Sequence, residues 1–296
     1  MSQEAASPEW EVKPSELVMS EPKEVLGKGK SGTVHKAVHP PTGKVVALKV
    51  VTIALQNNAD EVTRQLGDLY RSTHPNVAAF HGAEYNRAKQ CMLIAFEYMS
   101  RRSLKDLVVK NGSIPEAVMS IGCKHVLAGL NYLHNTRRIV HRDIKPSNVL
   151  VNGEGEFKIT DFGMSKELTD AIPQGQTWVG TSLYMSPERV GGEAHSYNAD
   201  VWSLGIVAVE CLTGSCPFGD SGQGDTCSMD MLDNIVDGPP PAVPHDSFSP
   251  QAVDFVSLCV TKNARERPGC SLLLDHPFLS LHPQDTAKNW LATTPS

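Results

Sequence analysis

Three side chains that can hold a cation or orient a hydroxyl group lie close together in the sequence. Asp143, Asn148 and Asp161 are separated by five and then thirteen residues. Between the last two, apolar strand patterns at residues 149–151 and 157–159 flank a polar, Gly-rich turn. A hairpin of that length folds back on itself, so we expect it to bring Asn148 and Asp161 to one edge. Their oxygen atoms would then face each other across a gap suited to a hard cation.

Asp143 would lie one short loop from that cation, where its carboxylate could orient the hydroxyl group of a substrate. A pair of metal holders beside a group that positions the nucleophile is the arrangement that phosphoryl transfer requires. Either aspartate alone would more often be an ordinary loop acid. Far more specific is the joint occurrence of the whole set, which reads His141-Arg142-Asp143, Lys145, Asn148 and Asp161-Phe162-Gly163.

This set resembles the catalytic segment of eukaryotic-type protein kinases. The run from Val179 to Arg189, Val-Gly-Thr-Ser-Leu-Tyr-Met-Ser-Pro-Glu-Arg, resembles more closely the corresponding run of mitogen-activated protein kinase kinases, and residues 145–152 and 161–165 point to the same family. The resemblance covers about residues 20 to 282. It implies an α+β, two-lobed protein kinase fold, with an antiparallel sheet plus one helix in the N-lobe and a mostly helical C-lobe.

Four segments are expected along the chain. They are a mobile N-terminal tail over residues 1–19, a kinase N-lobe over 20–97, a kinase C-lobe over 98–282 and a loose C-terminal tail over 283–296. The resemblance implies an enzyme that uses ATP and Mg²⁺, bound between the lobes, to phosphorylate Thr/Ser and Tyr in the activation loop of a mitogen-activated protein kinase.

The resemblance also assigns roles to individual side chains. Asp143 would position the acceptor hydroxyl group, while Lys145 and Lys49 would neutralise phosphate charge. Asn148 and Asp161 would hold the Mg²⁺ ion. Catalysis would then rest on placement and electrostatics rather than on covalent chemistry.

A Gly-rich segment, residues 27–32, precedes an alternating strand pattern that begins at Val34. Glycines at these positions let backbone N–H groups close over phosphate oxygens without interference from a Cβ atom. Alone, the pattern is weak, and a plain hairpin turn would explain it. The next strand pattern, residues 45–51, places Lys49 in an apolar run, where an ammonium group needs an anionic partner. In the kinase family, such a lysine holds the α- and β-phosphates of ATP.

The family pattern extends the expected nucleotide site to the hinge between the lobes. Phe96 falls at the back of the adenine pocket, and the backbone groups of Glu97 and Met99 would read the adenine edge. The expected cofactor contacts are Gly27, Lys28, Gly29, Gly32, Val34, Ala47, Lys49, Glu97, Met99, Ser103, Asn148, Leu150 and Asp161.

The chain departs from the family pattern on the helix expected over residues 59–71. The apolar register puts Gln65 where the family has the Glu that fixes the lysine, and Glu61 lies one turn earlier on roughly the same face. Gln65 could hydrogen-bond Lys49 without an ion pair, or the helix could shift so that Glu61 serves. Gln65 also favours one alternative function, a pseudokinase scaffold. The other alternative is a Ser/Thr kinase of a neighbouring branch.

Kinases of this family are switched on when an upstream kinase phosphorylates two hydroxyl groups between Asp161 and Glu188. Thr177 matches the second position, although a solvated loop hydroxyl is the alternative. Ala171 stands where the first would be expected, and Thr169 is the nearest substitute. A phosphate near Arg142 could order the segment through charge-assisted hydrogen bonds.

Several structural expectations follow from the later part of the chain. A long helix should begin at Pro115 and end near residue 135. In the family, the residue at Asp200 braces the backbone around His141 and Arg142, and the residue at Arg267 pairs with Glu188. We expect His125 and His134 to be surface or hydrogen-bonded histidines rather than metal ligands.

Composition limits the partners and the compartment. A net charge of −6 argues against a nucleic-acid partner, and no apolar run approaches the ~20 residues of a membrane span. The seven cysteines contain no Cys-x-x-Cys pair, and several sit in apolar runs. We therefore expect buried free thiols in a reducing compartment, the cytoplasm, and leave the nucleus open as a second one. The expected partners are a mitogen-activated protein kinase and an upstream activating kinase.

Overall fold

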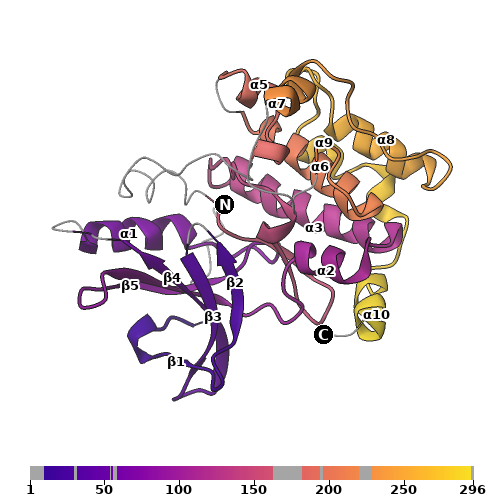
Figure 1. Cartoon of the computed structure of the whole chain (residues 1–296). Helices are drawn as coiled ribbons and strands as arrows, with labels where there is room; N and C mark the ends of the chain where they lie inside the picture. The colour runs from indigo at the N-terminus through magenta and orange to yellow at the C-terminus, as the bar shows by residue number, and fades with distance from the viewer. Residues whose placement is uncertain are drawn as a thin grey trace, which may run out of the picture. The chain divides into compact units, whose positions relative to one another are not determined.

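The computed structural model describes residues 10–29, 32–53, 55, 59–162, 182–193, 196–219 and 229–294. These residues divide into two compact units, and the division falls after Ser100, close to the lobe boundary expected after residue 97. The first unit is an antiparallel sheet with one helix, and the second is mostly helical (Figure 1). These are the α+β units that the sequence predicts, a sheet with one helix followed by a mostly helical part.

The first unit is built on a six-stranded sheet. Antiparallel pairs run in the order β1-β3-β4-β6-β5, and β2 also pairs with β3. The strands are β1 (Val18–Met19), β2 (Val25–Gly29), β3 (Gly32–His39), β4 (Lys44–Thr52), β5 (Phe80–Asn86) and β6 (Cys91–Glu97). The apolar middle of β4 is buried because it lies between β3 and β6 in the interior of the sheet.

Helix α1 (Ala59–Tyr70) is the helix predicted over residues 59–71. Val62, Leu66 and Tyr70 recur every four residues and are buried, which gives the helix one apolar stripe. The stripe packs on β5, and the Tyr70 ring contacts those of Phe80 and Phe96. The opposite side of α1 is exposed and carries its charged residues.

Residues 10–19 do not form the mobile tail that we expected. The Trp10 ring makes edge contacts with His39 and His81 at 5.1 and 4.9 Å, and the Val12 N–H donates to the His81 carbonyl at 2.8 Å. A 3₁₀ turn, η1 (Pro14–Glu16), then leads into β1. The expectation was wrong because one indole ring and backbone hydrogen bonds to a strand edge anchor a segment whose composition is polar.

The second unit is mostly α-helical. Its core lies between α3 and α6, and α6 is buried from Ala199 to Leu212, as expected for a central helix. The helices are α2 (Leu104–Asn111), α3 (Glu116–Asn135), α5 (Pro187–Val190), α6 (Asn198–Thr213), α7 (Met229–Val236), α8 (Pro250–Cys259), α9 (Cys270–Leu273) and α10 (Thr286–Thr293). The remaining elements are η2 (Pro146–Asn148), η3 (Ser182–Tyr184), η4 (Pro277–Ser280) and a two-stranded sheet of β7 (Val149–Val151) and β8 (Phe157–Ile159).

The boundaries predicted for the long helix of the second unit are confirmed at α3, and a side-chain cap fixes the start of α2. Ser103 caps α2 in a capping box with Asp106, in which each side chain accepts from the backbone N–H of the other residue. Pro115 is the N-cap residue of α3, which runs to Asn135. Proline suits this position because its missing N–H would be unpaired there in any case.

Residues 286–294 do not form part of a loose tail, which corrects a second expectation. Residues 286–293 form α10, whose Ala287 and Leu291 are fully buried and which packs against α3 (Figure 1). Two apolar side chains four residues apart are enough to seat this helix. Among polar neighbours, so short a stripe gives little sequence signal.

The six described cysteines are all free, and all but Cys216 are buried, which confirms the expectation for that part of the chain. Burial raises the pKa of the Cys123 thiol to about 12. Cys227 lies outside the described residues. In the described ranges, we find no helix with both the length and the apolar character needed to cross a membrane.

Candidate active site

The structure brings Asp143, Lys145 and Asn148 into direct contact. The Lys145 ammonium group donates to both carboxylate oxygens of Asp143, at 3.0 and 2.8 Å. The Asn148 amide nitrogen donates to the same carboxylate at 2.8 Å and to the Asp143 carbonyl at 2.8 Å. Because three hydrogen bonds converge on one carboxylate, its orientation is fixed before any substrate arrives.

Asn148 and Asp161 lie at the open end of the β7–β8 hairpin, as its length predicts. Val149 pairs with Ile159, and the Thr160 N–H donates to the Asn148 carbonyl at 3.0 Å. Asp161 follows directly, with a left-handed backbone conformation (φ 64°) that few non-glycine residues adopt. Such conformations persist only where the surrounding structure imposes them, and they cluster at functional sites.

Asp200, on α6, braces the loop that carries Asp143. Its carboxylate is buried and accepts from the backbone N–H groups of His141 (2.8 Å) and Arg142 (2.9 Å). The His134 ring contributes a third contact at 2.8 Å. Burial alone would raise the pKa of Asp200, but the hydrogen bonds from His134 and the backbone hold this pKa below its ordinary value.

Two contacts of this loop lie beyond what the sequence pattern indicated. His134 is buried, and it is the side-chain partner of Asp200. Arg189 donates from Nη1 to the carbonyl of Arg142 at 2.8 Å and so ties α5 to the catalytic loop. A buried polar residue on an apolar helix face was the available signal for His134, whereas nothing in the local sequence singles out Arg189.

In the first unit, β2 and β3 form the hairpin that carries the Gly-rich segment. Gly29 pairs with Gly32, and a Cβ atom added to Gly32 (φ 126°) would collide with the carbonyl oxygen of Val50. Gly27 and Gly29 have open space around the corresponding position. The hairpin therefore needs glycine at residue 32 to lie against β4, while residues 27 and 29 leave the backbone uncovered.

Three expected nucleotide contacts share one face of the sheet. Val34 is the cross-strand partner of Lys49, and Ala47 lies two residues before Lys49 on β4. Cross-strand partners and residues two apart in a strand point to the same side. Lys49 is buried, as the sequence indicated.

The hinge residues are held by β5 and by the chain just before it. The Glu97 N–H donates to the Ala79 carbonyl at 2.9 Å, and the Glu97 carboxylate accepts from the Ala79 N–H at 3.2 Å. Met99 is buried. In the second unit, Ser103 and Leu150 form an isolated antiparallel bridge, which places these two expected cofactor contacts side by side.

Glu61 and Gln65 make their side-chain contacts along their own helix. The Gln65 amide donates to Glu61 at 2.9 Å, and the Arg64 guanidinium donates to the same carboxylate at 2.7 and 3.0 Å. The hydrogen bond from Arg64 lowers the pKa of Glu61. Both Glu61 and Gln65 are exposed, so within the described residues neither forms the partnership with Lys49 that the sequence left open.

The activation segment is described only at its C-terminal end. Thr169, Ala171 and Thr177 lie outside the described residues. Beyond them, Arg267 forms a bidentate ion pair with Glu188, at 2.8 and 3.1 Å. This buried pair confirms the expected anchor.

The donor set at the hairpin end fits a hard divalent cation. In the described part of the chain, no group of three or more His, Cys, Asp or Glu side chains could hold a metal ion on protein ligands alone. Since the Asn148 amide nitrogen is engaged with Asp143, its oxygen is the atom suited to a cation, and the Asp161 carboxylate at the same end of the hairpin is the second candidate ligand. Two oxygen ligands leave room for water and phosphate oxygens, which Mg²⁺ prefers to keep.

Comparison with known proteins adds an independent observation. Residues 20–279 match the protein kinase domain. The chain is 40% identical over 260 residues to mitogen-activated protein kinase kinase 1 of Arabidopsis thaliana, a match that covers 87% of this chain and 73% of that protein. It is 39% identical over 261 residues to mitogen-activated protein kinase kinase SIPKK of Nicotiana tabacum, with coverage of 87% and 72%. Dual specificity mitogen-activated protein kinase kinase dSOR1 of Drosophila melanogaster is 36% identical over 276 residues, with coverage of 86% and 69%.

Proposed function

Because this chain belongs to the protein kinase family and, within it, to the mitogen-activated protein kinase kinases, we propose that it phosphorylates Thr/Ser and Tyr in the activation loop of a mitogen-activated protein kinase. The observation that carries the proposal is the cluster of Asp143, Lys145 and Asn148 at the hairpin end next to Asp161. These residue types supply both a hydroxyl-orienting carboxylate and oxygen ligands for a cation.

Asp143 is the proposed catalytic residue that accepts a hydrogen bond from the acceptor hydroxyl group. Lys145 and Asn148 hold its carboxylate from two sides, so the group costs little reorganisation when the substrate binds. Lys145 also brings a positive charge to the place where the transferred phosphoryl group would pass. The chemistry then depends on placement and charge.

Asn148 and Asp161 are the proposed ligands of Mg²⁺. When bound, the ion would neutralise the charge of the ATP phosphates. The oxygen-only donor set supports Mg²⁺ over softer metals, which favour thiolate or imidazole ligands.

For ATP itself, we propose contacts from both units. The first unit would contribute the glycines of the β2–β3 hairpin, the Lys49 ammonium group and the hinge backbone at Glu97 and Met99. The second unit would contribute Ser103 and Leu150 beside the metal ligands. The Ser103 hydroxyl already donates to the Asp106 carboxylate at 2.5 Å and accepts from the Asp106 N–H at 3.2 Å, so its proposed contact to the nucleotide would use the one lone pair that remains on this oxygen.

Regulation is proposed to follow the family. An upstream kinase would phosphorylate Thr177, with Thr169 as a second candidate, and the phosphate would pair with Arg142. The backbone of Arg142 is fixed by Asp200 and by Arg189, so its guanidinium group extends from an anchored position. We propose that the protein acts in the cytoplasm, with the nucleus as a second compartment.

The test is a transfer assay with Mg-ATP and a catalytically inactive mitogen-activated protein kinase, read separately for phospho-Thr and phospho-Tyr. We expect both products from the parent and neither from Lys49→Met or Asp161→Ala. Phospho-Thr without phospho-Tyr would instead assign the chain to a Ser/Thr kinase of a neighbouring branch. Variants that transfer phosphate as well as the parent would overturn the proposed roles.

A further inference from the structure

The hairpin that carries Asn148 and Asp161 is too small to be stable alone. It has two strands of three residues each, and a two-stranded ribbon is marginal in water even when longer. Other parts of the second unit must therefore hold it. We call residues 148–161 the hairpin and residues 284–294 the C-terminal segment, which contains α10.

The turn of the hairpin lies directly on the backbone of α10. Gly155 has a left-handed backbone (φ 77°), and a Cβ atom added there would lie 2.6 Å from the Lys288 nitrogen and 3.0 Å from the carbonyl carbon of Ala287. Side-chain atoms essentially never come so close. The turn and the helix can therefore touch only because residue 155 has no side chain.

Polar contacts join the same two segments on either side of Gly155. Lys288 donates to the Glu154 carboxylate at 2.5 Å. On the β8 side, the Phe157 N–H donates to Nδ1 of His125 at 3.2 Å, and Nε2 of that ring lies 2.7 Å from the Gln284 side-chain amide. Together, these two contacts link the Phe157 N–H of β8 to the C-terminal segment through the His125 ring.

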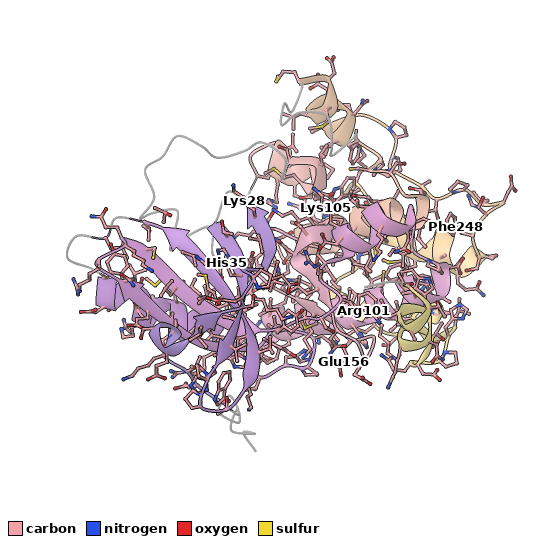
Figure 2. All side chains as sticks on the ribbon, turned by 60° about the horizontal axis from the view of Figure 1, so that its bottom comes forward. Lys28, His35, Arg101, Lys105, Glu156 and Phe248 are labelled. Carbon is pink, nitrogen blue, oxygen red and sulfur yellow. The ribbon has the colours of Figure 1, made fainter. Side chains whose placement is uncertain are left out.

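Strand β7 is held at its other edge by Arg101, labelled in Figure 2. The Arg101 N–H donates to the Val151 carbonyl at 3.0 Å, and its guanidinium donates to the Thr294 carbonyl at 3.0 Å. The backbone of one residue thus pairs with β7 while its side chain ties down the end of the C-terminal segment.

These contacts contribute unequally to the stability of the connection between the hairpin and the C-terminal segment. The Lys288–Glu154 pair is exposed, and exposed ion pairs contribute little. Ala287 and Leu291 are fully buried, so they fix α10 on α3, and the close approach of Gly155 then transmits that position to the hairpin. Packing, rather than charge, dominates the connection.

We propose that the C-terminal segment is a positioning element of the active site, which holds the hairpin so that Asn148 and Asp161 keep the separation a divalent cation needs. None of its residues is among the proposed catalytic residues or cofactor contacts. The inference rests on the proposed function for the roles of Asn148 and Asp161, but the contacts themselves do not depend on it.

The test compares Gly155→Ala with Gly112→Ala in the full chain. Both glycines have a positive φ (77° and 79°), but the space around Gly112 is open, so the control places a side chain at a positive φ without the collision. The first readout is amide hydrogen exchange of residues 149–159 without ligands. The second is the affinity for Mn²⁺ in the presence of ADP, measured by electron paramagnetic resonance.

We expect Gly155→Ala, but not Gly112→Ala, to speed exchange across the hairpin and to weaken Mn²⁺ binding about tenfold, the scale typical of lost support around a metal site. Hairpin exchange equal to that of the control would overturn the inference. Faster exchange with unchanged Mn²⁺ affinity would also overturn it, because the segment would then stabilise the hairpin without positioning the ligands.

A second comparison keeps the test valid if Gly155→Ala does not fold. The double variant Gln284→Ala/Lys288→Ala removes two exposed side chains, one that contacts the His125 ring and one that contacts Glu154 of the hairpin, and Asn289→Ala, on the same helix as Lys288, is its control. The double variant should speed amide exchange of the hairpin and weaken Mn²⁺ binding, both by a smaller factor than Gly155→Ala does. Exchange and affinity equal to those of the control would contradict the inference. A parent that binds Mn²⁺ but transfers no phosphate would refute the proposed function and leave the positioning result standing.

Discussion

Asp200 shows how a carboxylate that touches no substrate can determine the shape of a catalytic loop. Its two oxygens accept the N–H groups of His141 and Arg142, and Arg142 has a left-handed backbone (φ 70°). A loop with that conformation needs an external anchor, because the backbone alone disfavours it. The His134 ring contacts Oδ2, the same oxygen that accepts from His141.

We therefore expect Asp200→Ala to destabilise the protein by about 2 to 4 kcal/mol, because it leaves two backbone donors and His134 without their acceptor. Urea unfolding measures the loss. Asp254→Ala is the matched control, since it removes a carboxylate that also contacts a histidine but is exposed. Equal losses for the two variants would contradict the expectation that the buried Asp200 carboxylate contributes more to stability than an exposed one.

His125 gives the protein a predictable response to acid. Burial lowers the pKa of this histidine to about 4, below the ordinary value of 6.5 that it regains on unfolding. The unfolded chain binds the proton more tightly than the folded chain does. The contribution of neutral His125 to stability is therefore fully present above pH 6.5 and is lost as the pH falls from 6.5 towards 4. The lost contribution is on the order of 3 kcal/mol at pH 4.

The comparison is between the parent and His125→Asn, with unfolding free energies measured from pH 7 to pH 4. The variant should show a shallower decrease over this window, because the asparagine cannot titrate. Parallel curves for the two proteins would contradict the assignment of this pH dependence to His125.

The packing of the Gly-rich hairpin against β4 depends on the close approach of Gly32 to the Val50 carbonyl. We expect Gly32→Ala to destabilise the first unit by about 1 to 3 kcal/mol and to weaken ATP binding, since the new methyl group collides with the Val50 carbonyl at a strained φ of 126°. Gly29→Ala, which meets open space, serves as the stability control. Thermal unfolding and ATP titration provide the two measurements, and a Gly32→Ala protein as stable as the control would refute the packing argument.

The anchor between Glu188 and Arg267 joins α5 to the segment after α8. Removal of one partner from a buried ion pair leaves an uncompensated charge, so Arg267→Ala should cost about 3 to 5 kcal/mol. Arg267→Lys should recover only part of that loss, because lysine cannot form the bidentate contact. Arg64→Ala, at an exposed pair, should change stability by less than about 1 kcal/mol. Similar losses at both pairs, measured by urea unfolding, would contradict this ranking.

Elements with strong local signals could be predicted from the sequence, and those that depend on distant contacts could not. The apolar runs around the turn at residues 152–155 predicted β7 and β8, and the period of buried residues predicted α1 and α3. The order at residues 10–19 and in α10 depends on partners far away in the chain, such as His81 for Val12 and α3 for Leu291. Hydrophobic periodicity carries no information about such partners.

The same distinction holds within the candidate site. The spacing of Asn148 and Asp161 predicted their meeting at one hairpin end, because a short hairpin leaves no other geometry. The contacts of Glu61 could not be predicted in this way. Arg64 and Lys49 are both cations that this carboxylate could pair with, and the position of α1 on the sheet decides between them.

The proposed activity requires residues from both units. It also requires activation by an upstream kinase. A phosphate on Thr177 would carry a charge of −1.5 to −2, enough to form charge-assisted hydrogen bonds with Arg142. We expect Thr177→Glu to raise basal transfer several-fold and Thr177→Ala to abolish the response to an upstream kinase, both measured as phosphate incorporated into an inactive mitogen-activated protein kinase. A Thr177→Ala protein that is still fully activated would place the regulatory phosphate elsewhere.

The role of Asp161 as a metal ligand is tested most directly by the rate of phosphoryl transfer as a function of Mg²⁺ concentration. The measurement compares the Thr177→Glu protein with the same protein carrying Asp161→Asn. We predict that Asp161→Asn lowers the rate by about two to three orders of magnitude and shifts half-saturation to higher Mg²⁺, because one of two protein ligands loses its charge. An unchanged rate with an unchanged Mg²⁺ dependence would show that Asp161 does not hold the catalytic cation.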